Sequence, residues 1–237
     1  MINILKTREL AHNFGDVEAI TNPGSYHEFQ THEEAEAWGI KKYSDWARIH
    51  KEIFNGTSKY DKDSILRISD PVDAYLGYDF KRINSYLRGD DVFTTDSTDK
   101  NFISTQECAL ISRIENLILA IHSAPVLDKK IILYRQVPEE TIHNILSTPS
   151  YCERGFMSTS LVKTSCVENC GNSPYLLKIY VENRVPIHAI YANVIRYRDE
   201  NELLLQPDLS IRMAGYPYKD AESGKEIYEV KVFNMNI

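Results

Sequence analysis

The two halves of the chain have different hydrophobic periodicities, and the change falls at Lys129. Before it, apolar residues recur every three or four positions over long stretches, a spacing that places them on one face of a helix. After it, short β-branched runs alternate with turn residues, which is typical of strands. Helical and strand segments that are separated in this way form an α+β fold rather than alternating βα units. We therefore predict an α+β domain, helical first and β-rich second.

Three long helices are predicted in the first half. The first starts with a capping box at Thr31 and ends at Asn55-Gly56, the second covers Pro71 to Gly89, and the third starts at Ser104. Their apolar stripes are Ala35, Trp38, Trp46, Ile49 and Ile53; Val72, Leu76, Phe80, Ile83 and Leu87; and Leu110, Ile114, Leu117, Ile118 and Ile121.

The second half predicts a series of strands and one short helix, Pro138 to Leu146. The strands are expected near residues 130–135, 153–160, 174–181, 186–191, 201–206, 209–213 and 226–235. The 237 residues contain no internal repeat, low-complexity tract or recognisable linker, so a single domain is predicted.

Composition excludes some functional classes. A formal net charge of -7 argues against a sequence-independent nucleic-acid binder and against adhesion to anionic lipid. No apolar run approaches the roughly 18 residues of a transmembrane helix. Charge soon interrupts the first ten residues, so they are not predicted to be a Sec signal peptide. We expect no nucleic-acid and no membrane partner.

The cysteines and histidines predict neither a metal site nor a catalytic base. The four cysteines lack the paired spacing of a zinc site and are expected to be unpaired thiols in a reducing compartment. They are Cys108, Cys152, Cys166 and Cys170, the last two in a predicted loop.

Three short motifs carry the chemical information. Arg135 follows an apolar run, Ser158-Thr159-Ser160 closes a second predicted strand, and Glu200 and Glu202 precede three leucines. If a strand begins at Glu200, the two carboxylates lie on one face because side chains two apart point the same way. Taken alone, the pair of glutamates is more often solvated surface than a working site, and Arg135 could equally form a surface salt bridge.

In this order and context, the three motifs resemble the R-S-E class of bacterial mono-ADP-ribosyltransferase exoenzymes, specifically the iota-toxin-like, arginine- and actin-directed group. Ala35 to Gly39, Tyr43 to Trp46 and Ile83 to Arg88 also resemble recurrent stretches of that family. The resemblance implies one catalytic domain over residues 29–237, with N-terminal helices packed on a mixed or antiparallel β-sandwich core and an NAD cleft. Residues 1–28 would be an N-terminal extension of unknown role.

The resemblance also implies how NAD would be bound as a substrate, without a metal. Arg135 would grip phosphate oxygens, and Gln136 would lie near the nicotinamide carboxamide, although the family often has arginine or glycine there. Tyr75 and Asn84 would border the NAD cleft. They are nine residues apart and lie on opposite faces of an unbroken helix, so a break near Gly77 is expected. The family's phosphate-nicotinamide loop would correspond to Leu161 to Pro174.

The remaining roles concern catalysis and the target protein. Ser158 would hold Glu202, while Thr159 and Ser160 would shape the NAD cleft. Glu202 would stabilise the positive charge that develops on the ribose, as carboxylates do in glycosidases. Glu200 would orient or deprotonate an acceptor arginine, and Tyr197 would belong to the substrate-recognition turn.

The predicted function is NAD-dependent transfer of ADP-ribose to an arginine of a target protein, with host actin as the first expectation. The enzyme would act as a monomeric toxin or effector, secreted or injected into the host cytoplasm without a signal peptide. Two alternatives stay open at this point: an NAD glycohydrolase, and a catalytically inactive binding module. An enzyme that acts in the bacterial cytoplasm would have the same sequence features.

Overall fold

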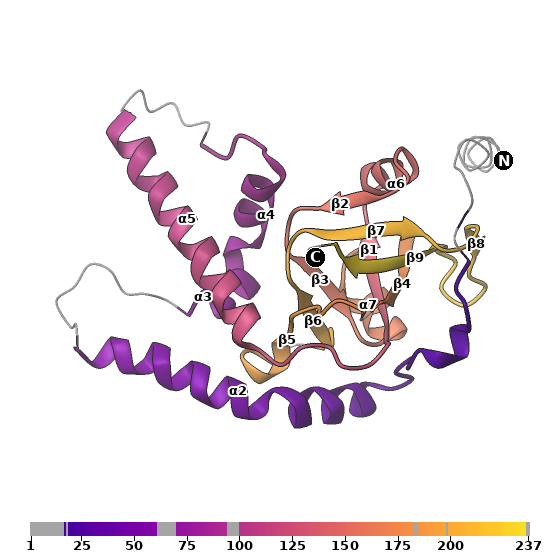
Figure 1. The fold of residues 1–237 in the computed structure, drawn as a ribbon, viewed down its shortest axis with the longest axis horizontal. Coiled ribbons are helices and arrows are strands. Elements are labelled where there is room, and N and C mark those ends of the chain that lie inside the picture. Colours follow the sequence, from indigo (N-terminus) through magenta and orange to yellow (C-terminus); the bar gives the residue numbers. More distant parts are fainter. Residues whose placement is uncertain are drawn as a thin grey trace.

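The computed structural model describes residues 17, 19–60, 70–93, 100–182, 184–197 and 199–235. Its long helices precede its sheet along the chain, which confirms the predicted single α+β domain (Figure 1). The first half contains the short turn η1 (Pro23–Ser25), α2 (His32–Tyr60), α3 (Pro71–Ala74), the π-helical turn η2 (Tyr75–Asp79), α4 (Phe80–Arg88) and α5 (Lys100–Ser123).

The second half forms a mixed sheet in which, among the described strands, only β4 and β9 pair in parallel. The strand order is β2-β7-β9-β4-β1-β3-β6-β5, with β8 on β9. The strands are β1 (Ile132–Val137), β2 (Tyr151–Glu153), β3 (Met157–Ser160), β4 (Tyr175–Val181), β5 (Ala189–Tyr191), β6 (Glu202–Leu205), β7 (Leu209–Met213), β8 (Tyr218–Lys219) and β9 (Glu226–Asn234). Helices α6 (Glu139–Leu146) and α7 (Lys163–Asn169) and the turn η3 (Ala192–Val194) lie between strands.

Strands β1 and β3 form an incomplete junction in the sheet, which is called the seam. Along its whole length β1 pairs with β4, but it pairs with β3 only through Tyr134 and Ser160. Beyond that pair the two strands separate, so Arg135 and Ser158 have no ladder partner across the seam. This separation leaves room between the strands for a cleft.

Helix α2 differs from the prediction at its C-terminal end. It continues through Asn55-Gly56 to Tyr60, because one glycine costs a helix only about 1 kcal/mol. Ile49 and Ile53 are exposed rather than part of the core, since this part of α2 runs past the sheet (Figure 1). At the N-terminal end, Thr31 caps the helix as expected, accepting a hydrogen bond from the Glu34 amide at 3.2 Å.

Two other predicted boundaries were wrong. Helix α5 begins at Lys100, before the expected cap at Ser104. The stretch from Leu161 to Pro174, expected to be a loop, contains the short helix α7, which includes Cys166 and has Cys170 as its C-cap. In the part of the chain that the structure describes, no helix is both long and apolar enough to cross a membrane.

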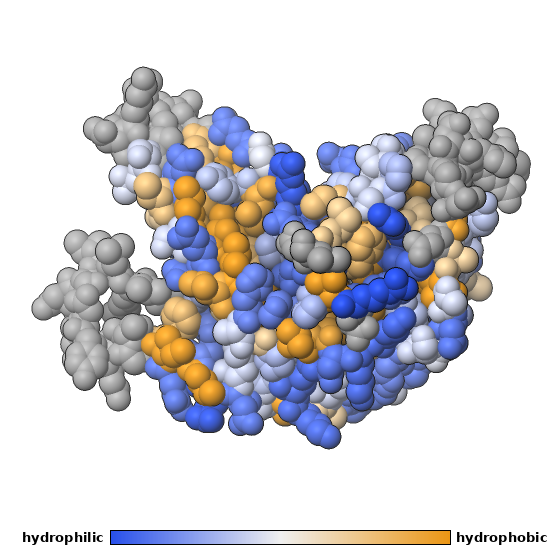
Figure 2. All heavy atoms as spheres, in the orientation of Figure 1, coloured by the Kyte–Doolittle hydropathy of each residue, from blue (hydrophilic) through white to orange (hydrophobic). Residues whose placement is uncertain are grey.

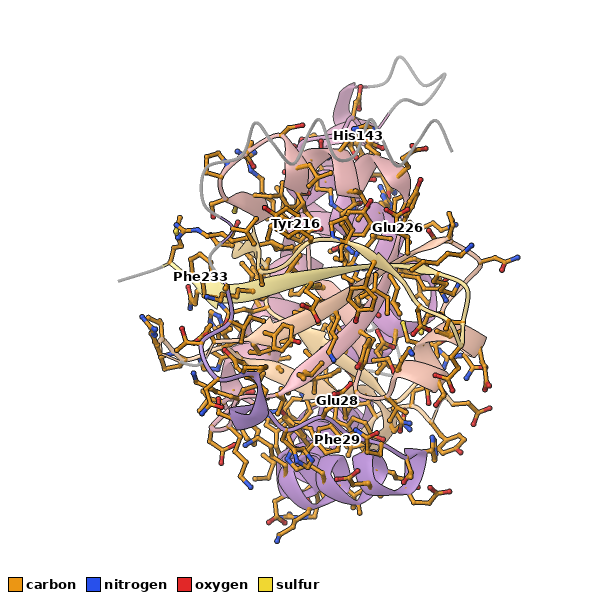
Figure 3. All side chains as sticks on the ribbon, turned by 90° about the vertical axis from the view of Figure 1, so that its right-hand side faces the viewer. Glu28, Phe29, His143, Tyr216, Glu226 and Phe233 are labelled. Atoms are coloured by element: carbon orange, nitrogen blue, oxygen red, sulfur yellow. The ribbon has the colours of Figure 1, made fainter. Side chains whose placement is uncertain are left out.

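Part of the predicted N-terminal extension packs on the sheet. The Tyr26 ring meets the Tyr180 ring edge-on at 5.1 Å, and its hydroxyl donates to Glu182. Glu28 accepts a hydrogen bond from the Tyr134 hydroxyl of β1 and lies with Phe29 between α2 and the sheet (Figure 3). These contacts make Tyr26 and Glu28 part of the packed structure, while the domain boundary at residue 28 stays a prediction.

Candidate active site

Helices η2, α4 and α5 form a helical arm, and a cleft opens where this arm faces the seam of the sheet. Figure 2 shows the hollow between the helical arm and the sheet. Nine residues predicted from the sequence line it: Tyr75, Asn84, Arg135, Gln136, Ser158, Thr159, Ser160, Glu200 and Glu202. The sequence analysis did not place six others there, namely Leu76, Phe80, Tyr134, Cys166, Asn169 and Cys170. Phe80, predicted to be a core residue, is 42% exposed at this cleft.

Glu202 is fixed at the start of β6. It pairs with Ser160 in the β3–β6 ladder, and its side chain is buried. The Ser158 hydroxyl donates a hydrogen bond to the Glu202 carboxylate at 2.5 Å. Hydrogen bonds to a carboxylate are among the strong ones, so this contact holds Glu202 in one orientation. The sheet and Ser158 together aim the carboxylate into the cleft.

Glu200 reaches the cleft by a different route from the one predicted. Strand β6 begins at Glu202, so Glu200 is not on the strand, and the intervening Asn201 has a left-handed backbone with φ of 47°. The Ser160 hydroxyl donates to the Glu200 backbone carbonyl at 2.6 Å. The two glutamates therefore converge because of a left-handed residue, and not because of strand alternation.

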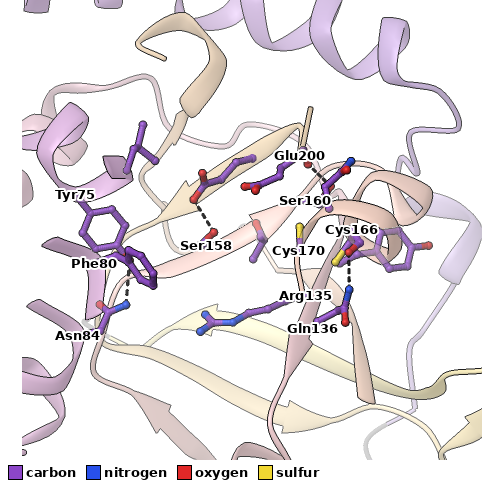
Figure 4. Close-up of a pocket in the computed structure, with 15 residues that line it drawn as sticks. Tyr75, Phe80, Asn84, Arg135, Gln136, Ser158, Ser160, Cys166, Cys170 and Glu200 are labelled. Atoms are coloured by element: carbon purple, nitrogen blue, oxygen red, sulfur yellow. Dashed lines mark hydrogen bonds between the residues drawn. The ribbon is translucent and has the colours of Figure 1, made fainter. Parts of the chain in front are cut away.

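The Arg135 side chain extends from β1 into the cleft, on the side of the seam where β1 and β3 are not paired (Figure 4). Among the described residues, none is found in an ion pair with its guanidinium. Figure 4 shows Arg135, Ser158 and Glu200 directed toward the same space. A guanidinium that faces a cleft in this way offers a planar, bidentate contact for a phosphate.

Tyr75 and Asn84 meet without the helix break that was expected near Gly77. The chain stays helical from Pro71 to Arg88, but the π-helical turn η2 is wider than an α-helical turn and changes the rotation between them. The Asn84 amide donates to the Tyr75 hydroxyl at 3.0 Å. Burial raises the pKa of the Tyr75 hydroxyl above its ordinary value, so this group stays protonated.

The Asn84 side chain also holds the chain that leads into β3. Its Oδ1 accepts from the Phe156 amide at 2.9 Å, and its Nδ2 donates to the Phe156 carbonyl at 3.3 Å. A Cβ added at Gly155 would come within 2.9 Å of Asn84 Oδ1, which explains the glycine beside this contact. Asn84 thus connects the helical arm to the strand that bears Ser158.

A second interaction, which the sequence analysis missed, also joins the helical arm to the chain that leads into β3. Arg88 donates two hydrogen bonds of 3.0 Å each to the buried Glu153, and Glu153 accepts a third from the Gly155 amide at 2.9 Å. Arg88 belongs to the Ile83 to Arg88 stretch that was noted for its resemblance, but no sequence signal indicated its partner. This ion pair, in which only Glu153 is buried, fixes α4 against the chain that leads into β3.

Gln136 and Lys163 are engaged with neighbouring elements. The Gln136 amide donates to the Cys166 carbonyl at 2.7 Å and accepts from Lys225 at 3.0 Å, so the side chain ties β1 to α7. Lys163 pairs with Asp220 at 2.9 Å and does not line the cleft. The proposed contact between Gln136 and NAD stays a prediction.

Tyr197 lies on the exposed segment between η3 and Glu200. Its side chain is 64% exposed and does not line the cleft itself. The neighbouring Arg196 lies 3.7 Å from Asp73 of α3, which brings this segment beside the helical arm. An exposed aromatic residue close to a cleft is placed to touch a bound macromolecule, and that role stays a prediction.

Solved bacterial ADP-ribosyltransferase toxins have a fold similar to that of this chain. No curated protein matches the chain. The toxin Plx2a from Paenibacillus larvae has a similar structure, with a TM-score of 0.60 and 19% identity over 87% of this chain and 99% of that one. C3stau2 from S. aureus, solved with NAD, matches with a TM-score of 0.57 and 19% identity over 89% and 99% of the two chains.

A third structure is BECa, the ADP-ribosylating toxin of a binary enterotoxin of C. perfringens, solved with NADH. It matches with a TM-score of 0.61 and 18% identity over 88% of this chain, which spans only 50% of BECa. These structural matches support the fold. The family model for ADP-ribosyltransferase exoenzymes matches residues 35–231, which include every predicted site residue. The chain therefore belongs to the ADP-ribosyltransferase exoenzyme family, whose substrate is NAD.

Proposed function

We propose that the protein is a toxin or effector that transfers ADP-ribose from NAD to an arginine of a target protein. The observation that carries this proposal is the position of Glu200 beside Glu202 in the cleft, with Ser158 bonded to Glu202. NAD chemistry needs only the carboxylate of Glu202. The second carboxylate, Glu200, supplies the base that an arginine acceptor needs.

The first step is cleavage of NAD. The bond between the ribose C1′ and the nicotinamide nitrogen breaks, and its electron pair leaves with nicotinamide. Positive charge then develops on the ribose, and the fixed carboxylate of Glu202 stabilises that charge more than it stabilises the ground state. Arg135 holds the phosphates by its planar guanidinium. Because the Glu202 side chain is buried, little water screens its charge, and its electrostatic effect on the ribose is stronger.

The second step is attack by the acceptor. A guanidinium has a pKa above about 12 and is a poor nucleophile until it loses a proton. Glu200 takes that proton as a guanidine nitrogen forms the new bond to C1′. The products are an ADP-ribosylated arginine, nicotinamide and one proton. Tyr197, exposed on the same segment, contacts the target protein around the acceptor.

The target protein is proposed by analogy with the iota-toxin-like group, in which Glu at the position of Glu200 goes with arginine acceptors. Actin is the first candidate. The protein would reach the host cytoplasm by secretion or injection, as expected for a member of a toxin family.

The test is incubation of the purified chain with labelled NAD and a eukaryotic cell lysate, followed by mass spectrometry of each labelled band. We expect a band that carries ADP-ribose on arginine. A band modified on another residue type would contradict the arginine assignment. Free ADP-ribose without any band would favour the glycohydrolase, and no NAD turnover would favour the binding module.

A further inference from the structure

We infer that Asn201, the residue between the two glutamates, is a positioning residue that sets where Glu200 stands in the cleft. The inference rests on the proposed function, because it concerns the step in which Glu200 accepts a proton from the acceptor. Asn201 does not line the cleft, and its side chain is fully buried. A buried polar side chain next to a catalytic carboxylate needs partners, and their arrangement shows what it does.

The backbone of Asn201 changes the direction of the chain. Its φ of 47° lies in the left-handed region, where asparagine and glycine are the residues best tolerated. The Asn201 carbonyl accepts a hydrogen bond from the Leu161 amide at 3.1 Å. The turn therefore carries Glu200 out of the line of β6 while both flanking carboxylates still reach the cleft.

The amide of Asn201 is anchored from three sides. Its Oδ1 accepts from the Tyr191 hydroxyl at 3.0 Å, and its Nδ2 donates to Ser165 at 3.2 Å and contacts His32 Nδ1 at 2.7 Å. These partners come from β5, from α7 and from the first residue of α2. One buried side chain thus ties the segment that carries Glu200 to three elements.

The two glutamates depend on this anchor to different extents. Glu202 is held by the β3–β6 ladder and by Ser158, and neither contact involves Asn201. Glu200 lies before the strand, outside the β3–β6 ladder, and its backbone carbonyl accepts a hydrogen bond from the Ser160 hydroxyl. Loss of the Asn201 anchor should therefore move Glu200 and leave Glu202 in place.

Helix α2 is packed directly against the anchor. A Cβ added at Gly39 would fall 2.2 Å from the Tyr191 ring, so the helix backbone rests on the residue whose hydroxyl bonds Asn201. Any larger residue at Gly39 would have to push that ring. Through Tyr191 and Asn201, the position of α2 thereby affects the position of Glu200.

The test measures two activities of the full chain: release of nicotinamide from NAD in water, and ADP-ribosyl transfer to agmatine, a small guanidine. Asn201→Gly keeps the left-handed backbone but removes the anchor. We expect transfer to fall by about tenfold to a hundredfold, as for a misplaced catalytic group, while hydrolysis stays within about threefold of the wild type.

Tyr191→Phe is a milder variant, which removes one hydroxyl and leaves the segment from Glu200 to Glu202 untouched. Transfer should fall by about two- to tenfold, the effect of one lost hydrogen bond, again with hydrolysis retained. Tyr180→Phe is the matched control. It removes the hydroxyl that donates to Glu229 at 3.1 Å, outside the cleft, and should leave the ratio of transfer to hydrolysis unchanged.

The possible outcomes separate the two proposals. Wild-type protein that cleaves NAD but modifies neither agmatine nor an arginine in the lysate overturns the proposed function, and this inference with it. Wild-type transfer together with an unchanged ratio in both Asn201→Gly and Tyr191→Phe overturns this inference alone. A parallel loss of both activities also overturns it, because Asn201 would then only support the fold.

Discussion

At the scale of single residues, the cleft contains two carboxylates with different surroundings. Glu202 is buried, belongs to a strand and accepts a hydrogen bond from Ser158. Glu200 is half-buried and precedes the strand. A group that stabilises charge gains from burial and rigidity, while a base for a protein acceptor must be reached from outside. The two environments fit the two proposed steps.

Glu200→Gln is therefore expected to separate the two activities. The amide cannot take a proton from the acceptor, so transfer to arginine should fall by about 10²- to 10⁴-fold, the usual contribution of a general base. Hydrolysis of NAD should continue, because Glu202 and Arg135 are unchanged. Parallel assays of nicotinamide release and protein labelling measure both activities, and an equal loss of the two would argue against the acceptor role.

At the scale of secondary structure, the sequence predicted which elements exist better than it predicted their irregularities. The helical stripes and β-branched runs gave α2, α4, α5 and most strands, because burial of one face governs both patterns. The π-helical turn η2 and the left-handed Asn201 were missed. Both depend on tertiary partners, such as Phe156 for Asn84 and Tyr191 for Asn201, that no local pattern contains.

The predicted site residues converged for a related reason. Arg135, Ser158 and Glu202 each sit on a strand that the sequence predicted, so their meeting required only the correct strand order. The pair of Arg88 and Glu153 and the cysteines beside the cleft gave no signal of their own. Their positions follow from how α4 and α7 pack, which the sequence does not state locally.

The contact of Asn84 with Phe156 gives a prediction about stability. Asn84→Leu would leave the buried Phe156 amide and carbonyl without this partner, and each such group costs about 1–3 kcal/mol. We expect the free energy of unfolding in urea to fall by about 2–4 kcal/mol. Asn144→Leu, at an exposed position on α6, is the control and should change it by less than about 0.5 kcal/mol. Equal stability of the two variants would contradict the assigned role of Asn84.

At the scale of the whole molecule, the helical arm and the sheet are joined near the C-terminal end of α5. There the rings of His122 and His188 lie 4.7 Å apart, and Val126 bridges to His188 beside β5. Burial, and then the nearby His122, lower the pKa of His188 below its ordinary value. This junction should therefore respond to acid.

The direction of that response follows from proton linkage. Because the pKa of His188 is lower in the folded chain, the unfolded chain binds the proton more readily as the pH falls. The contribution of His188 to stability is complete above its ordinary pKa of about 6.5 and is lost as the pH falls through the folded value. Thermal unfolding between pH 7.5 and about 5 should show a drop in Tm that is smaller in His188→Gln. His143→Gln, at an exposed position, should behave as the wild type, and an identical pH dependence in all three proteins would refute the prediction.

The central claim is that Glu202 drives the chemistry of NAD in this cleft, and Glu202→Gln tests it most directly. The variant keeps the size of the side chain and an acceptor for the Ser158 hydroxyl but removes the charge that stabilises the ribose cation. Nicotinamide release should fall by about a thousandfold, while calorimetry shows NAD affinity within about threefold of the wild type and an unchanged fold. Nicotinamide release at the wild-type rate from the folded variant would contradict the account.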